Sequence, residues 1–228
     1  FTDIASEMLY PVVPVYLRSL GYSMVWIGIL EGIAEGMVGL SKGFFGKESD
    51  RIGKRLPFIK MGYALSACSK PLMAISTQIG WIFSARLTDR LGKGIRTAAR
   101  DALLSQQAGK GEKGRIFGFH RSWDTAGAVI GPLAAIAFLT FHPGEYRFLF
   151  LLAFIPGLLS IILLFRINEK GSERREHLSK GFFSYFSYIR SSPSLYRKLV
   201  AGLFLFALAN SSDVFLLLRT KEIVRNDS

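Results

Sequence analysis

Apolar stretches long enough to cross a membrane constrain this chain more than any other feature. A helix of about twenty apolar residues matches the hydrocarbon thickness of a bilayer, and runs near that length recur along the sequence. They cover residues 1–20, 24–45, 57–76, 81–99, 120–141, 148–165 and 199–218. A soluble fold has no place for such a series, so the sequence predicts an all-α integral membrane protein of about seven transmembrane helices.

The distribution of basic residues gives the expected orientation. The formal net charge of +12 would suit a nucleic-acid binder if it gathered on one face. Here the basic residues lie in the turns after the second, fourth and sixth runs, while the other turns carry few positive charges. Basic loops stay in the cytoplasm. We therefore expect a multi-pass protein of the cell (inner or plasma) membrane, with a cytoplasmic N-terminus and no nucleic-acid partner.

The segment 46–55 between the second and third runs is the most distinctive motif. It is expected to form a short cytoplasmic turn, in which glycine permits the chain reversal and basic side chains hold the loop in the cytoplasm. Its aspartate, at the end of the second helix, can accept backbone or arginine hydrogen bonds. The residues of this gating loop are Gly46, Asp50, Arg51, Gly53, Lys54 and Arg55.

Acidic residues inside the first two runs are candidates for proton binding. Glu7 lies well inside its run, near the bilayer centre at about 1.5 Å per residue, and shares a helix face with Asp3. Glu35 repeats that spacing with Glu31. A carboxylate at this depth must face the protein interior or water. It serves either proton or cation binding or a structural salt bridge.

The fourth run carries a charged stripe at three- or four-residue spacing, so its members share one helix face. Such a stripe lines a polar cavity or pairs with acids on neighbouring helices. For Arg90 both a role in coupling or substrate binding and a structural ion pair remain open. The stripe consists of Arg86, Asp89, Arg90, Lys93, Arg96 and Arg100.

Three motifs resemble signatures of the major facilitator superfamily. Residues 46–55 are similar to its loop between helices 2 and 3, and Arg90 with Gly94 is similar to its helix-4 signature. Gly127, Gly131 and Pro132 resemble a helix-5 signature of its antiporters, although an alanine follows where that signature has glycine.

The resemblance implies a domain plan and a site. The plan is a six-helix bundle over residues 1–166, a basic amphipathic cytoplasmic linker over 167–198, and helix 7 within 199–228, with both chain ends truncated. Helices 1, 4 and 7 would line a central cavity, and Asp50 would act in a latch between two halves. The expected cavity residues are Glu7, Glu35, Arg86, Asp89, Arg90, Asp124, Asn210 and Asp213.

The functional expectation is a secondary transporter that works by alternating access. Proton-coupled export of a drug-like or small organic solute comes first, and uptake or exchange of an organic anion, a carboxylate or phosphate ester, is the alternative. A non-transporting receptor of the same fold is a third reading. The expected partners are the solute, protons and the lipid bilayer, and the full-length protein is expected to be monomeric.

Nothing in the sequence indicates catalysis. The spacing of a nucleotide-binding phosphate loop is missing, as are metal-ligand spacing and a catalytic constellation. We therefore expect neither an enzyme nor a cofactor or metal. The pairing of Arg86 and Arg90 separates the two transport readings: arginines that stand free in the cavity favour an anionic substrate.

Overall fold

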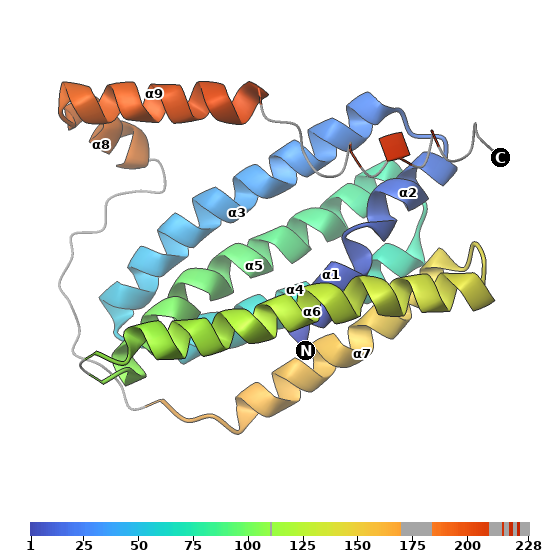
Figure 1. Ribbon diagram of the computed structural model, residues 1–228, viewed down its shortest axis with the longest axis horizontal. Coiled ribbons are helices and arrows are strands. Elements are labelled where there is room, and N and C mark those ends of the chain that lie inside the picture. The colour runs from blue at the N-terminus through green and yellow to red at the C-terminus, as the bar shows by residue number, and fades with distance from the viewer. Residues whose placement is uncertain (110, 170–183, 210–215, 217–218, 221–222, 224–228) are drawn as a thin grey trace. The chain divides into compact units, whose positions relative to one another are not determined.

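The computed structural model describes the chain except at residues 110, 170–183, 210–215, 217–218, 221–222 and 224–228 (Figure 1). Asn210 and Asp213, two of the predicted cavity residues, therefore lie outside the described residues. The described part of the chain is helical and contains no strand. It divides into two compact units, Phe1–Glu176 and His177–Ser228.

The first unit is a helical bundle organised around α5. Its helices are α1 (Thr2–Leu9), α2 (Val12–Ser19), α3 (Met24–Ile52), α4 (Leu56–Ile75), α5 (Ile79–Gln107), α6 (Lys113–Phe141) and α7 (Tyr146–Phe165). α5 packs along both α3 and α4, α6 packs along α1, and α7 contacts α4 and α1 (Figure 1). Because neighbours flank α5 on two sides, its charged stripe is enclosed by protein.

Two glycines of α5 explain how closely its neighbours approach. A Cβ atom built on Gly92 would lie 2.5 Å from the carbonyl oxygen of Gly62 on α4. A Cβ on Gly94 would overlap the hydroxyl of Ser41 on α3. Small residues at such crossings let helix backbones come together. The glycines that follow Arg90 thus place α5 tightly between α3 and α4.

The glycines of the predicted helix-5 motif make the contact between α6 and α1. A Cβ on Gly127 would lie 3.1 Å from the Cβ of Asp3, and one on Gly131 would lie 2.7 Å from the backbone nitrogen of Met8. Pro132 lies within α6, which continues to Phe141. The motif therefore serves to admit the backbone of α1 against α6.

The prediction of one continuous helix over residues 1–20 was wrong, because the structure breaks it into α1 and α2 around Tyr10 and Pro11. Proline lacks the N–H that an α-helix needs and its ring clashes with the preceding turn. Pro11 and Pro14, three residues apart, together disfavour a continuous helix. The break separates the acidic first half of the segment from its apolar second half.

The prediction that residues 46–55 form a turn was also wrong. α3 continues to Ile52, so Asp50 and Arg51 lie in its last turns, and only residues 53–55 connect it to α4. Gly53 ends α3 in the left-handed conformation, with φ 71°, and its N–H donates to the Ser49 carbonyl oxygen at 3.1 Å. Glycine adopts this conformation without a steric penalty.

The polar loop expected over residues 97–119 is likewise mostly helix. α5 runs on to Gln107 and α6 begins at Lys113. At 29 residues each, α3, α5 and α6 are about 44 Å long. They exceed the hydrocarbon core of about 30 Å, so polar helical turns extend beyond it.

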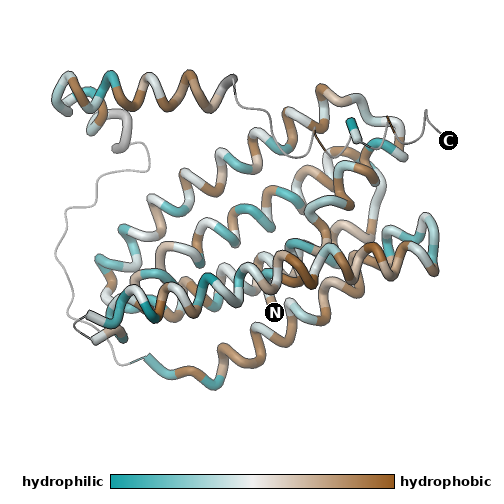
Figure 2. The backbone as a smooth tube through the Cα atoms, in the orientation of Figure 1, coloured by the Kyte–Doolittle hydropathy of each residue, from teal (hydrophilic) through white to brown (hydrophobic). Residues whose placement is uncertain are grey.

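Three helices of the described residues, α3, α6 and α7, are long and apolar enough to cross a membrane. Figure 2 shows α7 as hydrophobic along nearly its whole length, whereas α5 alternates between hydrophobic and hydrophilic positions. α5 is long enough but not apolar enough to be among them, because its charged stripe lowers its hydropathy. Its polar face is covered by protein, so overall hydropathy understates its suitability for the bilayer.

The second unit contains α8 (Ser184–Ser191) and α9 (Ser194–Ala209), which contact each other. The rings of Tyr188 and Tyr196 meet edge to face, with centroids 5.9 Å apart. α9 begins at Ser194, five positions before the predicted start of helix 7 at 199. The predicted end of that helix lies partly outside the described residues.

Candidate functional site

A buried charge network joins α3, α4 and α5. Arg86 donates from Nε and Nη2 to the two carboxylate oxygens of Glu31, each at 2.9 Å. Asp89 accepts hydrogen bonds from Lys70 and Ser66, both at 2.6 Å. The four charged residues are each at most 6% exposed. Because two cations meet two anions in hydrogen-bonded pairs, the network is neutral and internally satisfied.

Arg90 extends this network toward an exposed acid. Its Nη2 lies 3.1 Å from a carboxylate oxygen of Glu35 and 3.7 Å from one of Glu31. The Arg90 side chain is 4% exposed, while that of Glu35 is 57% exposed. Its guanidinium also lies over the ring of Tyr10, 5.9 Å from the centroid. Arg90 thus links the buried pairs to a carboxylate at the surface of this unit.

A separate polar cavity of about 330 Å³ lies between α1, α5 and α6. Glu7 and Asp124 line it, but Arg86, Asp89 and Arg90 do not. Those three residues lie on the face of α5 toward α3 and α4. That Glu7 shares one polar space with them stays a prediction. The cavity is lined by Asp3, Glu7, Lys93, Arg96, Thr97, Arg100, Arg121, Asp124, Thr125 and Ala128.

Arg96 is the most deeply buried cation of this cavity, at 1% exposure. Its Nη2 lies 3.6 Å from the Asp3 carboxylate, and its guanidinium lies 4.6 Å from the ring centroid of Tyr63. Its Nε and Nη1 are buried without a hydrogen-bond partner in the described part of the chain. A buried donor without a partner costs free energy, so these two atoms mark a place where a ligand or a moving side chain can bind.

Asp124 meets three groups at the edge of the same cavity. Its Oδ2 lies 3.3 Å from His120 Nδ1 and 4.0 Å from Arg100 Nη2. Its carboxyl group is within hydrogen-bond reach of that of Asp3, which lines the same cavity. Sequence reasoning grouped Asp3 only with Glu7. Because α1 packs against α6, Asp3 lies next to Asp124 instead.

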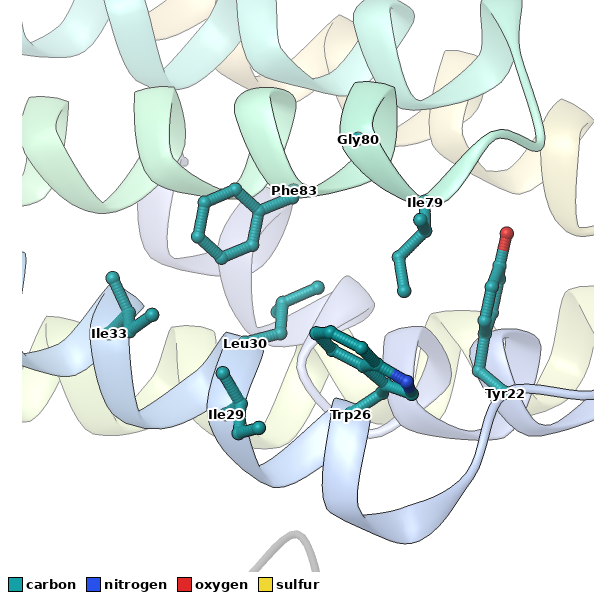
Figure 3. A pocket seen from close by; sticks show the side chains of 8 residues that line it. All are labelled: Tyr22, Trp26, Ile29, Leu30, Ile33, Ile79, Gly80 and Phe83. Carbon is teal, nitrogen blue, oxygen red and sulfur yellow. The ribbon is translucent and has the colours of Figure 1, made fainter.

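A second pocket of about 440 Å³ is almost entirely apolar. It lies between the first turns of α3 and α5, and Figure 3 shows Trp26 and Phe83 facing one another across it, with Tyr22 at one end. The Tyr22 hydroxyl donates to the carbonyl oxygen of Thr77 at 2.9 Å. Aromatic walls with few polar groups suit an apolar ligand.

The residues of the predicted gating loop form local contacts. Arg55 Nη2 lies 2.9 Å from Asp50 Oδ1, and Arg51 pairs with Glu48. Glu169, which sequence reasoning missed, accepts hydrogen bonds from the backbone nitrogens of Arg55 and Leu56 at 2.7 to 3.0 Å. Because Glu169 is more than a hundred positions away, no local sequence signal points to this cap on α4.

Comparison with known proteins decides the family. The sequence model of the Major Facilitator Superfamily matches residues 1–224. The chain belongs to this superfamily. It is a multi-pass membrane protein, as the superfamily and the apolar helices indicate. No three His, Cys, Asp or Glu side chains among the described residues are grouped to hold a metal ion.

Individual relatives agree with this assignment. An uncharacterized MFS-type transporter of Methanocaldococcus jannaschii is 31% identical over 223 residues, which are 97% of this chain and 54% of the relative. Multidrug resistance protein MdtH of Cronobacter sakazakii is 30% identical over 55% of this chain and 31% of its own. Multidrug resistance protein MdtG of Klebsiella pneumoniae is 26% identical over 74% and 41%. The chain spans about half the length, or less, of these relatives.

Proposed function

We propose that the protein is a secondary transporter of the cell membrane that exports a drug-like or small organic solute in exchange for protons. Superfamily membership supports transport by alternating access, and relatives named multidrug resistance proteins support a drug-like solute. The basic connection between α3 and α4 supports a cytoplasmic N-terminus.

The pairing of Arg86 and Arg90 is the observation that carries the proposal. Arg86 is hydrogen-bonded to Glu31. Arg90 forms ion pairs with Glu35 and Glu31, although its buried Nε and Nη2 have no hydrogen-bond partner in the described residues. An anionic solute needs arginines whose charge is not already neutralised. Since acids of α3 neutralise both arginines, the pairing favours an uncharged or cationic solute over an anion.

The apolar pocket supports the same solute class. Its walls at Trp26 and Phe83 present aromatic faces (Figure 3), which bind flat apolar molecules and attract organic cations. A solute there would lie within one or two turns of Glu31 along α3. It would therefore be close to the charge network that reaches Glu35.

The proton would bind a carboxylate that faces water or the protein interior. Glu35 meets this condition because its side chain is exposed from this unit yet paired with Arg90. Glu7 meets it as a lining residue of the polar cavity. We assign proton coupling to these two carboxylates. Arg90 keeps the Glu35 side chain in place while Glu35 binds and releases the proton.

Uptake or exchange of an organic anion is the second candidate, and one observation favours it. Arg96 presents two unpartnered donors in a cavity that Lys93 and Arg100 also line. A small carboxylate or phosphate ester would fill those donors. Three acids line the same cavity and oppose an anion there, so we rank this function below solute export.

Inside-out membrane vesicles that contain the full-length protein and hold an imposed pH gradient test the proposal. Candidate solutes are added singly while a fluorescent dye follows the gradient. We expect a drug-like solute to dissipate the gradient, and Glu35→Gln or Arg90→Ala to abolish that response. Glu145→Gln, a carboxylate at the start of α7 outside the network, is the matched control and should behave as wild type.

Two outcomes oppose the proposal. A broad panel of drug-like solutes that leaves the gradient intact removes its basis, and labelled organic anions are then tested for exchange. A response that survives both Glu35→Gln and Arg90→Ala shows that coupling does not use this pair.

A further inference from the structure

We propose that Asp3 and Asp124 share a single proton across the contact between α1 and α6, and that this pair is a proton-binding site of the protein. The inference deepens the proposed function and rests on it only for the role of the proton in transport. It adds this pair to Glu7 and Glu35 as a further place where a proton is held.

The contact between the two carboxyl groups itself requires the proton. An ionised carboxylate has acceptors only, whereas a protonated carboxyl has one donor. The side chains of Asp3 and Asp124 are within hydrogen-bond reach of each other. A hydrogen bond between them therefore exists only when one of the two carries a proton, and two ionised groups at this separation repel.

Helix packing holds the pair together. Gly127 lies one turn after Asp124 on α6, and a Cβ on it would lie 3.1 Å from the Cβ of Asp3. Gly131 repeats the close approach one turn further along, against the backbone of Met8. Because the backbones of α1 and α6 meet at these glycines, the two carboxyl groups cannot separate widely while the helices stay packed.

Each carboxyl group also has its own arginine on α5, just outside hydrogen-bonding distance. Arg96 Nη2 lies 3.6 Å from Asp3, and Arg100 Nη2 lies 4.0 Å from Asp124. Arg96 keeps two buried donors without a partner in the described residues. The Asp3 carboxylate therefore makes no hydrogen bond to these donors in the proton-sharing arrangement.

The other titratable groups around the pair lie on α1, α4, α5 and α6. His120 Nδ1 lies 3.3 Å from Asp124 on the same helix. Tyr63 on α4 contacts both arginines. The remaining ones are Glu7, Lys93 and Arg121, which line the cavity, and Asp101, which lies 3.4 Å from Arg100. The cations outnumber the acids, so the site tolerates a doubly ionised pair once the proton has left.

The proton therefore selects between two arrangements. With it, one carboxyl O–H donates to the other carboxylate and ties α1 to α6. On release, the O–H bond breaks, the proton passes to water in the cavity of about 330 Å³, and two carboxylates remain. Each then moves to its arginine on α5, Asp3 to Arg96 and Asp124 to Arg100. Binding or losing the proton shifts α1 between its neighbours, which a transporter can use to change conformation.

Infrared difference spectroscopy on the purified full-length protein tests the pair directly. Spectra are compared between mildly acidic and mildly alkaline buffer, and the carbonyl band of protonated carboxyl groups is followed. We expect Asp3→Asn and Asp124→Asn each to remove the same band, and the double variant to remove no more. Glu145→Gln, a carboxylate at the start of α7 that does not line the cavity, should leave that band in place.

The proposal is overturned if the band survives both single variants, or if the two variants remove different bands. Failure of the pair and failure of the proposed function remain distinguishable. If the two variants remove the same band but no solute moves protons in vesicles, the proton-sharing pair is supported and coupled export is refuted. If solutes move protons in vesicles but the variants do not remove the same band, coupled export is supported and the proton-sharing pair is refuted.

A measurement on the wild-type protein tests the shared proton even if the variants do not fold. An apolar carbodiimide reacts with protonated carboxyl groups in apolar surroundings, and mass spectrometry locates the adduct. We expect one adduct per molecule, on either Asp3 or Asp124, that declines as the buffer becomes alkaline. Adducts on both residues of one molecule, or on neither, contradict a shared proton.

Discussion

Arg86 and Glu31 form a bidentate pair in which both hydrogen bonds measure 2.9 Å, and the two side chains are only 2% and 7% exposed. Breaking a buried pair by removing one partner leaves an uncompensated charge and costs about 3–5 kcal/mol. The pair therefore anchors α3 to α5. It also explains why Arg86 is not available to a solute.

Glu31→Ala should lower the free energy of unfolding by about 3 kcal/mol or more, because Arg86 then stays buried without its acid. The double variant Glu31→Leu with Arg86→Met should recover much of that loss, since an apolar pair has no charge to desolvate. Chemical unfolding of the full-length protein in detergent measures both. Equal losses from the single and the double variant would contradict the pairing.

Gly94→Ala should destabilise the bundle by about 1–3 kcal/mol, because its Cβ overlaps the Ser41 hydroxyl. Gly114→Ala is the matched control, since a Cβ there meets nothing within 4 Å. Alanine favours helix over glycine by about 1 kcal/mol, so the control should be neutral or stabilising. Thermal unfolding compares them, and an equal shift in both would refute the close crossing of α3 and α5.

Glu169→Ala should lower stability by about 1 kcal/mol, the usual cost of a lost helix cap, because the first backbone nitrogens of α4 lose their acceptor. Glu145→Ala is the comparison, since Glu145 precedes α7 yet makes no side-chain cap hydrogen bond. Hydrogen exchange at Leu56 and its neighbours should quicken in the first variant alone. Unchanged exchange there would show that Glu169 does not cap α4.

Trp26→Ala should weaken binding of an apolar solute by roughly tenfold or more, a cost of about 1.4 kcal/mol, because it removes one wall of the apolar pocket. Trp123→Ala removes another exposed tryptophan, on α6 and away from this pocket, and should leave affinity unchanged. Fluorescence titration with one transported solute gives the dissociation constant of each variant. Equal weakening would place the solute elsewhere.

The sequence predicted the apolar helices well where hydropathy marks both ends. The expected helices at 57–76 and 148–165 match α4 (Leu56–Ile75) and α7 (Tyr146–Phe165) to within one or two residues. It placed the ends of α3 and α5 too early, because a helix that leaves the bilayer continues in polar residues. Hydropathy marks the edge of the membrane there, not the end of the helix.

The charged stripe on α5 was predicted, but its partners were not. Arg90 pairs with Glu35, and Arg86 pairs with Glu31, one helical turn away. Lys70 gave a signal, a lone cation in an apolar run, without indicating Asp89. Which acid meets which base depends on how far each helix is rotated about its axis. That rotation follows from glycine contacts that only the packed structure reveals.

Coupling between solute and proton is the central claim, and reconstitution tests it most directly. Purified full-length protein is placed in liposomes loaded with a solute that it binds, with equal pH on both sides and a pH-sensitive dye inside. We predict that solute leaving the liposomes draws protons inward, and that Arg90→Ala stops both movements. Solute efflux with no change in internal pH would contradict proton exchange.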